Sequence, residues 1–430
     1  MMRSTHLMAA STLWVSLLAA APASAEEALC AQRAPCRVVE TLEAGKDAKG
    51  QPLQVKHLSL GWLDAETASN ATGRKFVAKR KAEGSRERNE CEAAEWWLIR
   101  PGSPAQLLLS VCNDGYGASG VGEDVVTVGD RLFTHQQSGG SAERWNSSRT
   151  LQLSPLALVR ESLESFHTGE PEKVRGSRWD VTELRGEAIV PPPSCDGAES
   201  IGGRTLPYLP LVQVEKAYLQ GGWKQAGLGS CALTAGSWVL GKAEDPKDAG
   251  LKAVLAERET LLVEVRDNRW TGPSGTKWLA DDHVELWMAP WPPQELTGCG
   301  QPLKDQKAVQ WGIRIADGQV FPAYGSPKQK LKVEKAEIRG PEGLEGYRLK
   351  VTLPKGFRSV SVSYSDSDEG KKQERMVATS PLKFPRPETL NAVRLVLPEE
   401  ATCVVREGKL VVVPTELKPK GPDVAVLTSP

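Results

Sequence analysis

LLVEVRDNRW (residues 261–270) and KWLADDHVELWMAPW (residues 277–291) decide the fold, because both segments alternate apolar with polar residues around a short loop. Such alternation is typical of β-strands. Four tryptophans crowd into this stretch: Trp270, Trp278, Trp287 and Trp291. Tryptophan offers a large flat apolar surface and one N–H donor. The cluster therefore indicates either a hydrophobic core or a platform for a flat, hydroxyl-rich ligand, and both interpretations remain open.

Residues 281–288 form two sets, because neighbours on a strand point to opposite sides of a sheet. One set is mostly apolar and should face the core: Asp282, Val284, Leu286 and Met288. The other set is mostly polar: Asp281, His283, Glu285 and Trp287. A large aromatic side chain on a polar face is unusual. We therefore predict that the Trp287 indole projects outward into a water-accessible groove.

Short alternating runs bounded by glycine, proline, asparagine and aspartate continue along the chain, with 40 glycines and 30 prolines to make turns. They predict an all-β, mainly antiparallel protein. Leu156–Phe166 fits a strand followed by a short helix. Residues 191–204, with three consecutive prolines and then two glycines, fit a linker. We expect a β-rich N-terminal domain (26–190), a C-terminal β-sandwich (205–414) and a flexible tail (415–430).

The first 25 residues resemble a signal peptide, with Arg3 before an apolar run and a small-residue cleavage site, Ala23-Ser24-Ala25. This leader predicts a secreted or periplasmic protein. The apolar run is too short for a membrane span of roughly 20 residues. Without Arg3 the chain has one basic residue fewer than its 54 acidic ones. That balance argues against nucleic acid and against electrostatic docking on membranes.

All eight cysteines follow the leader. An even number in an exported chain favours disulfides, and the absence of any CxxC motif disfavours a metal site. Sequence order suggests pairing of neighbours, although eight cysteines allow 105 connectivities. The expected bonds are Cys30–Cys36, Cys91–Cys112, Cys195–Cys231 and Cys299–Cys403.

The second half of the chain resembles the family-9 carbohydrate-binding modules and their related β-sandwich superfamily. Four pieces in order carry the resemblance: the V-x-D strand end at 260–267, the D-x-V-E strand at 282–286, the G-Y strand at 346–354, and the strand, D-x-D turn and strand at 360–380. The resemblance implies an antiparallel β-sandwich with an aromatic-lined sugar site and structural calcium. The I-D-G and tryptophan that open such modules have only Gly221-Gly222-Trp223 as a poor counterpart here.

The residues expected to bind a ligand are the four tryptophans together with polar neighbours that could bond sugar hydroxyls: Glu285, Arg266, Arg269 and His283. Asp366, Asp368 and Glu369 have carboxylates that suit Ca²⁺. The alternative for these three is a solvated acidic turn before Lys371 and Lys372. Calcium is the one cofactor suggested, because His283 and Met288 point to opposite faces and cannot share a haem iron.

We find no catalytic motif: the chain has no G-x-S-x-G elbow and no H-E-x-x-H. The favoured interpretation is a non-catalytic protein that binds a polysaccharide or glycan. Two alternatives of other classes remain. One is an envelope structural or interaction protein without its own ligand. The other is a hydrolase with its active site in the N-terminal domain.

Overall fold

The computed structural model describes residues 29–30, 36–64, 90–113, 121–190, 204–243, 245, 248–257, 259–273, 278–290, 307–325, 330–380, 391–395 and 401–417. Strands dominate this part of the chain and most pair antiparallel, so the protein is all-β, as predicted. No helix among these residues is long and apolar enough to cross a membrane. The predicted leader lies outside the described residues.

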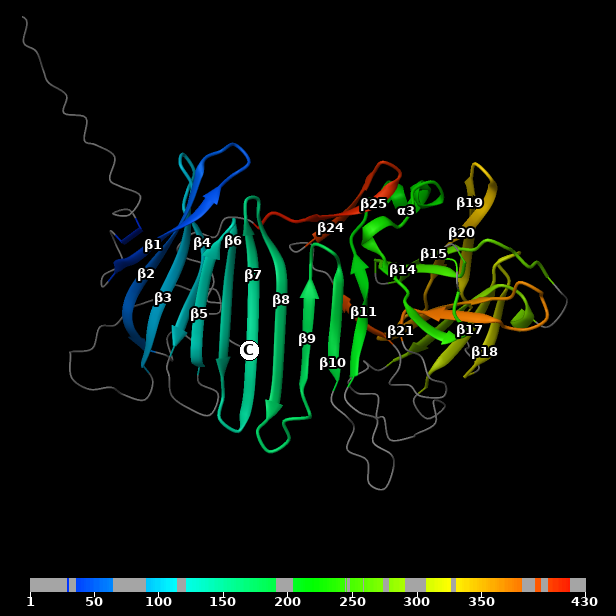
Figure 1. Ribbon diagram of the computed structural model, residues 1–430, viewed down its shortest axis with the longest axis horizontal. Coiled ribbons are helices and arrows are strands. Elements are labelled where there is room, and N and C mark those ends of the chain that lie inside the picture. Colours follow the sequence, from blue (N-terminus) through cyan, green and yellow to red (C-terminus); the bar gives the residue numbers. More distant parts are fainter. Residues whose placement is uncertain are drawn as a thin grey trace, which may run out of the picture.

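The N-terminal half forms antiparallel sheets in chain order (Figure 1). The first sheet comprises β1 (Arg37–Lys46), β2 (Pro52–Asp64), β3 (Glu90–Ile99) and β4 (Gln106–Asn113). The next series is β5 (Val121–Gly129), β6 (Leu132–Gly139), β7 (Glu143–Leu153), β8 (Leu156–His167), β9 (Arg175–Asp180), β10 (Arg185–Val190) and β11 (Arg204–Val212). The short helix expected after Leu156 is wrong, because β8 pairs along its length with β7 and also with β9. Pairing on both sides outweighs the local sequence preference.

The C-terminal half is built from two groups of strands. One group contains β12 (Leu233–Thr234), β14 (Gly250–Ala256), β15 (Thr260–Arg266), β19 (Lys332–Gly340) and β20 (Gly343–Thr352). The other contains β13 (Ser237–Leu240), β16 (His283–Ala289), β17 (Val309–Arg314), β18 (Val320–Tyr324), β21 (Ser359–Asp366) and β22 (Arg375–Ala378). β23 (Asn391–Leu395) joins β21 to β11. Short helices are α3 (Lys216–Gln220), η1 (Gly222–Lys224), η2 (Gly229–Cys231) and η3 (Trp278–Ala280).

The core of this half lies between the two groups and follows the alternation of the sequence. Val263 on β15, Leu286 on β16 and Leu349 on β20 are fully or almost fully buried in one hydrophobic cluster. Trp311 belongs to the same cluster, as its alternation predicted. At roughly 25 cal/mol per Å² of buried apolar surface, such strands are stabilised mainly by the hydrophobic effect. The core therefore fixes which side of β16 faces outward.

A second hydrophobic cluster continues through both halves of the chain. It includes Leu151 and Trp179 from the N-terminal strands, and Trp223 and Leu262 from the C-terminal half. β10 also pairs directly with β11, so strand pairing joins the two sides of the linker expected at residues 191–204. Residues 191–203 of the expected linker lie outside the described part. Strand pairing and a shared core therefore connect the N-terminal strands with the C-terminal half.

The hairpin of β24 (Ala401–Arg406) and β25 (Lys409–Pro414) fastens the end of the chain to earlier segments. Gly227 N–H donates to the Gly408 carbonyl in the hairpin turn, and Leu410 N–H donates to the Gly227 carbonyl, both at 2.8 Å. Leu417 N–H donates to the Leu156 carbonyl at 2.7 Å. Cys231 and Cys403 form a disulfide. The start of the expected flexible tail is therefore bonded to β8, whereas residues 418–430 lie outside the described part.

The Cys231–Cys403 disulfide shows that two of the expected pairings, Cys195–Cys231 and Cys299–Cys403, are wrong. The fold brings Cys231 next to the hairpin that contains Cys403. Order along the chain does not reveal such a long-range contact. The expected Cys30–Cys36 bond is confirmed. The side chains of Cys91 and Cys112, and residues 195 and 299, lie outside the described part, so their bonds stay predictions.

Replacing Cys231 and Cys403 together by alanine should lower the free energy of unfolding by about 5 kcal/mol, because the bond closes a loop with a separation of 172 residues. The matched Cys30→Ala/Cys36→Ala variant opens a separation of 6 residues and should cost only about 2 kcal/mol. Guanidinium unfolding without reductant measures both values. Equal losses would show that loop length is not the origin of the stabilisation.

Candidate functional site

β16 lies between β17 and β21, and its register aligns polar residues on the outer face. His283 pairs with Arg314 and Ser365, and Glu285 pairs with Gly312 and Ser363. Val284, Leu286 and Met288 point into the core, as predicted. The outer face of β16 thus presents His283, Glu285 and Trp287 in sequence, as the alternation indicated.

Glu285 is the centre of a buried polar cluster on this face. Its side chain is 7% exposed. Gln310 Nε2 donates to Oε2 at 2.7 Å, and Gln373 Nε2 donates to Oε1 at 3.1 Å. His283 Nε2 lies 3.3 Å from the same Oε1. Hydrogen bonds from segments far apart in the sequence therefore hold one carboxylate in a fixed orientation.

His283 is fully buried beside Glu285. Its Nδ1 lies 2.7 Å from the Asp281 carbonyl oxygen, which only accepts hydrogen bonds, so Nδ1 carries a proton. Its Nε2 lies 3.3 Å from both Gln373 Nε2 and Glu285 Oε1, so the ring adjoins the carboxylate and the amide that orients it.

An aromatic pair stands beside this cluster. The Trp278 ring stacks on Phe321 with centroids 5.5 Å apart and contacts His283 edge to face at 4.7 Å. Trp278 lies directly over Gly312, since a Cβ atom there would be 2.2 Å from the ring. Arg314 covers the Phe321 ring at 5.3 Å. Trp278 and Phe321 are both partly exposed, so an apolar surface adjoins a buried carboxylate.

Serines on β21 add hydroxyl groups to the same face. Ser363 and Ser365 are fully buried, and their Oγ atoms have no hydrogen-bond partner within the described part of the chain. Buried polar groups normally have partners. These hydroxyls therefore supply hydrogen-bonding capacity next to Glu285 and His283.

The expectation that Trp287 opens to water is wrong: its side chain lies on the outer face but is only 3% exposed. It packs with Ala289, Ala308 and Tyr324, because β16 is a central strand whose two faces are both covered. Trp270 packs edge to face on Tyr347, against the core. Of the four tryptophans, Trp278 is partly exposed and contacts His283 beside Glu285, and Trp291 lies outside the described residues.

The two predicted arginines lie elsewhere. Arg266 is on β15, in the other group of strands, and its Nη1 donates to Glu345 at 2.6 Å. Arg269 is exposed, and its backbone N–H donates to Asp267 at 3.1 Å. Of the polar residues expected at a ligand site, the structure therefore brings together His283 and Glu285. Phe321, Gln310 and Gln373 were missed, because no sequence signal links their distant segments.

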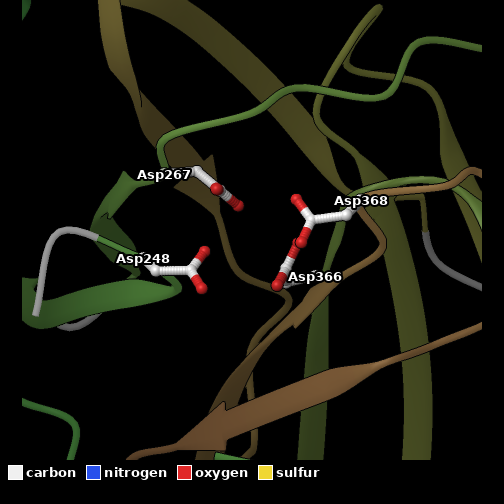
Figure 2. A group of neighbouring side chains, drawn as sticks. All are labelled: Asp248, Asp267, Asp366 and Asp368. Atoms are coloured by element: carbon white, nitrogen blue, oxygen red, sulfur yellow. The ribbon is translucent and has the colours of Figure 1, made fainter. Parts of the chain in front are cut away.

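Four aspartates converge at the edge of the sandwich (Figure 2). Asp248, Asp267, Asp366 and Asp368 each offer one oxygen, and these oxygens lie within 4.8 Å of one another. We call this group the acidic cluster. Asp366 is fully buried, so the alternative of a solvated turn is wrong for this residue, whereas the Asp368 side chain is 22% exposed. Glu369 is not a member, since it is exposed and pairs with Lys371.

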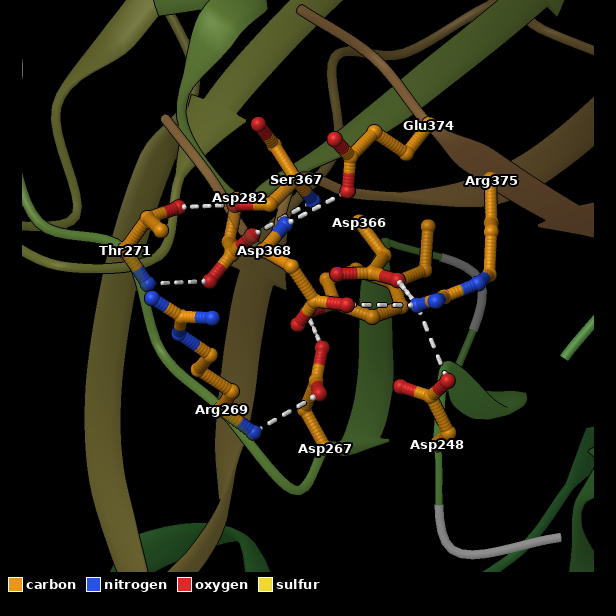
Figure 3. Close-up of polar contacts among 11 residues, drawn as sticks. Asp248, Asp267, Arg269, Thr271, Asp282, Asp366, Ser367, Asp368, Glu374 and Arg375 are labelled. Carbon is orange, nitrogen blue, oxygen red and sulfur yellow. Dashed lines mark hydrogen bonds and ion pairs between the residues drawn. The ribbon is translucent and has the colours of Figure 1, made fainter. Parts of the chain in front are cut away.

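One arginine, Arg375, forms ion pairs with members of the acidic cluster (Figure 3). Arg375 Nη1 lies 2.9 Å from Asp248, also pairs with Asp366, and lies 3.1 Å from Asp368. One positive charge cannot balance four carboxylates. The Oδ1 atoms of Asp248, Asp366 and Asp368 are buried without a hydrogen-bond partner in the described part. Hard oxygen ligands at these distances fit Ca²⁺.

Burial and crowded negative charge raise the pKa values of carboxyl groups in this region. Burial raises the pKa of Asp267 to about 8, and the charge of Asp366 adds to the rise. Burial also raises the pKa of Asp366 to about 6, with Asp368 and Asp248 contributing. The Tyr364 hydroxyl donates to Asp267 and partly opposes the rise in its pKa. The cluster is therefore poised to take up protons or a cation.

Asp282 connects the acidic cluster to β16. It accepts hydrogen bonds from Thr271 N–H at 2.7 Å and from Ser367 N–H at 3.0 Å. Burial raises its pKa to about 7. Asp282, the first residue of the D-x-V-E segment, therefore connects the loop that contains Thr271 to the loop that contains Ser367. One of them, after β21, also carries Asp368 and Gln373.

Comparisons with known proteins find structural similarity only. A scan against protein-family models and a search of curated proteins give no match. Among solved structures, the chain is similar to a family-9 carbohydrate-binding module from Caldicellulosiruptor kristjanssonii in complex with cellotriose, at 12% identity and a TM-score of 0.31, covering 44% of this chain and 97% of that one. The module in complex with glucose gives 12% identity and a TM-score of 0.28, covering 37% and 84%. This is the family that the sequence motifs resemble.

Proposed function

We propose that the chain is an exported, non-catalytic carbohydrate-binding protein whose C-terminal β-sandwich holds a glycan beside Glu285. The observation that carries the proposal is the fixed Glu285 carboxylate next to the partly exposed Trp278–Phe321 pair. Sugar rings have apolar C–H faces and polar edges, so sites that bind them combine aromatic rings with oriented polar groups. The disulfides Cys30–Cys36 and Cys231–Cys403 in the described part of the chain fit an oxidising compartment such as the periplasm or the cell exterior.

The aromatic pair, the carboxylate and the two glutamines contribute to sugar binding in different ways. The exposed edges of Trp278 and Phe321 bury the apolar side of a sugar ring. Glu285 accepts from sugar hydroxyls, and such charge-assisted hydrogen bonds are stronger than neutral ones. Because Gln310 and Gln373 already orient the carboxylate, little side-chain entropy is lost on binding.

The test is titration calorimetry of the full mature chain against a glycan panel. The panel includes cellotriose and glucose, the ligands named for the two similar structures. Glu285→Gln should weaken binding at least tenfold, because it removes the charge of the central acceptor. Glu337→Gln is the matched control, since Glu337 lies on β19 and is exposed. Binding unchanged by Glu285→Gln, or no binding by the wild type, would refute the proposal.

We also propose that the acidic cluster holds a structural Ca²⁺. Asp248, Asp267, Asp366 and Asp368 would supply its protein oxygens. The ion would offset the negative charge that Arg375 leaves unbalanced. It would also fix the turn after β21, which contributes both Asp368 and the Gln373 side chain that orients Glu285.

A further inference from the structure

A second polar surface lies far from Glu285, on the N-terminal strands. Two grooves of about 420 Å³ and 310 Å³ cross the β5–β10 series and share Gln136, Ser148 and Ser162. Figure 1 shows these strands side by side. Because the grooves share residues on three successive strands, β6, β7 and β8, they form one continuous trough, which we call the sheet groove.

The register orders the side chains of the sheet groove. Gln136 pairs with Ser148, Ser148 with Ser162, and Ser162 with Arg178. Directly paired residues point to the same face, and neighbouring strands lie about 4.8 Å apart. A parallel row contains Thr134 and Thr150. Hydroxyl and amide groups therefore repeat at regular spacing across the strands.

The side chains of Gln136, Ser148 and Ser162 form no hydrogen bond within the described part of the chain. Hydroxyls and amides can each donate and accept. Their backbone groups are already used in pairing with both neighbouring strands. An extended peptide adds to a free strand edge through such backbone groups, so this face does not suit one.

The sheet groove carries both charges, with three arginines and five acids over its two parts, and two of the acids, Glu123 and Glu164, line the smaller groove. Three arginines and three acids line the larger groove: Arg160, Arg178, Arg185, Glu161, Asp180 and Glu187. Arg160 pairs with Asp180 at 2.9 Å, and Arg178 pairs with Glu164 at 2.7 Å. A surface of mixed charge with an excess of acids does not complement a polyanion, and Trp179, which lines the larger groove, is only 2% exposed and offers no aromatic anchor for a protein hot spot. A neutral chain with many hydroxyl groups matches it best.

We propose that the sheet groove is a second glycan-binding site, which takes a neutral polysaccharide laid across strands β5–β10. Its hydroxyl and amide rows exchange hydrogen bonds with successive sugar units. This inference rests on the N-terminal strands alone and does not require the site at Glu285. If both sites bind one polymer, the chain is bivalent and gains avidity on long glycans over short ones.

The test is affinity electrophoresis of the full mature chain in gels containing hydroxyethyl cellulose, xylan or laminarin. Ser148→Ala/Ser162→Ala should weaken retardation about tenfold in apparent dissociation constant, from two lost hydrogen-bonding groups. The matched control is Ser165→Ala/Ser177→Ala, which changes two serines that line neither groove on β8 and β9. Circular dichroism checks that both variants fold.

The outcomes separate this inference from the proposal for the sandwich. Retardation that survives Glu285→Gln and is weakened about tenfold in Ser148→Ala/Ser162→Ala supports the sheet groove, even if the sandwich binds nothing. Retardation abolished by Glu285→Gln alone overturns it. Equal retardation of Ser148→Ala/Ser162→Ala and the wild type, or no retardation in any of the three gels, overturns it as well.

Discussion

Gly312→Ala is expected to weaken carbohydrate binding at the sandwich at least tenfold. A Cβ atom at this position would lie 2.2 Å from Cζ3 and 2.4 Å from Cη2 of Trp278. The indole must move, because the added Cβ is bonded directly to the backbone of β17, which pairs on both sides and cannot shift easily. Overpacking of this kind costs about 1–3 kcal/mol. The displaced ring loses its stack on Phe321, so the affinity measured by calorimetry should fall at least tenfold.

Gly236→Ala is the matched control for this change, since nothing lies within 4 Å of the added Cβ atom. Near-ultraviolet circular dichroism should change for Gly312→Ala and stay constant for Gly236→Ala. A Gly312→Ala protein with wild-type affinity would show that Trp278 does not take part in binding.

Calcium is expected to stabilise the protein strongly. A ligand present at a hundred times its dissociation constant stabilises a folded protein by about 2.7 kcal/mol. Calorimetric melting in millimolar CaCl₂ should therefore show a higher Tm than melting in EDTA. Asp366→Asn should remove most of the difference, because Asp366 is the fully buried member of the acidic cluster. Glu369→Gln should keep it, since Glu369 is exposed and lies outside the cluster.

The pH dependence of the same melts gives a second readout. In EDTA, the pKa values of Asp267 and Asp366, about 8 and about 6, lie above the ordinary value of 3.8. The folded state then binds protons more tightly than the unfolded state, so stability should fall as the pH rises from about 4 to about 8. Bound Ca²⁺ replaces these protons and should flatten the slope. An identical slope with and without calcium would contradict the assignment.

Alternation along the sequence predicts most of the strands and the inward face of β16, because the period of two is a local property. It does not predict what covers the outward face. Trp287 illustrates the limit: its direction is correct, but packing of Tyr324 and Ala308 against it buries the ring. Exposure depends on segments that pack from elsewhere in the chain, and a single strand pattern contains no information about them.

The acidic cluster likewise combines residues that the sequence identified with residues that only the fold brings together. The D-x-D turn identified Asp366 and Asp368, whereas Asp248 and Asp267 come from the loop before β14 and from the end of β15. Likewise, pairing neighbouring cysteines succeeded over a separation of 6 residues and failed for Cys231 and Cys403. Local patterns reveal part of each site, and the fold supplies the remaining members.

The Cys231–Cys403 bond also determines how the molecule responds to mechanical tension. A pull applied between the two ends of the chain passes from Cys403 directly to Cys231 through the sulfur atoms. Residues 232–402 lie outside that load path. The strands that carry Glu285 and the acidic cluster are therefore shielded from stretching, and the extended length of the chain is shortened by the whole of this segment.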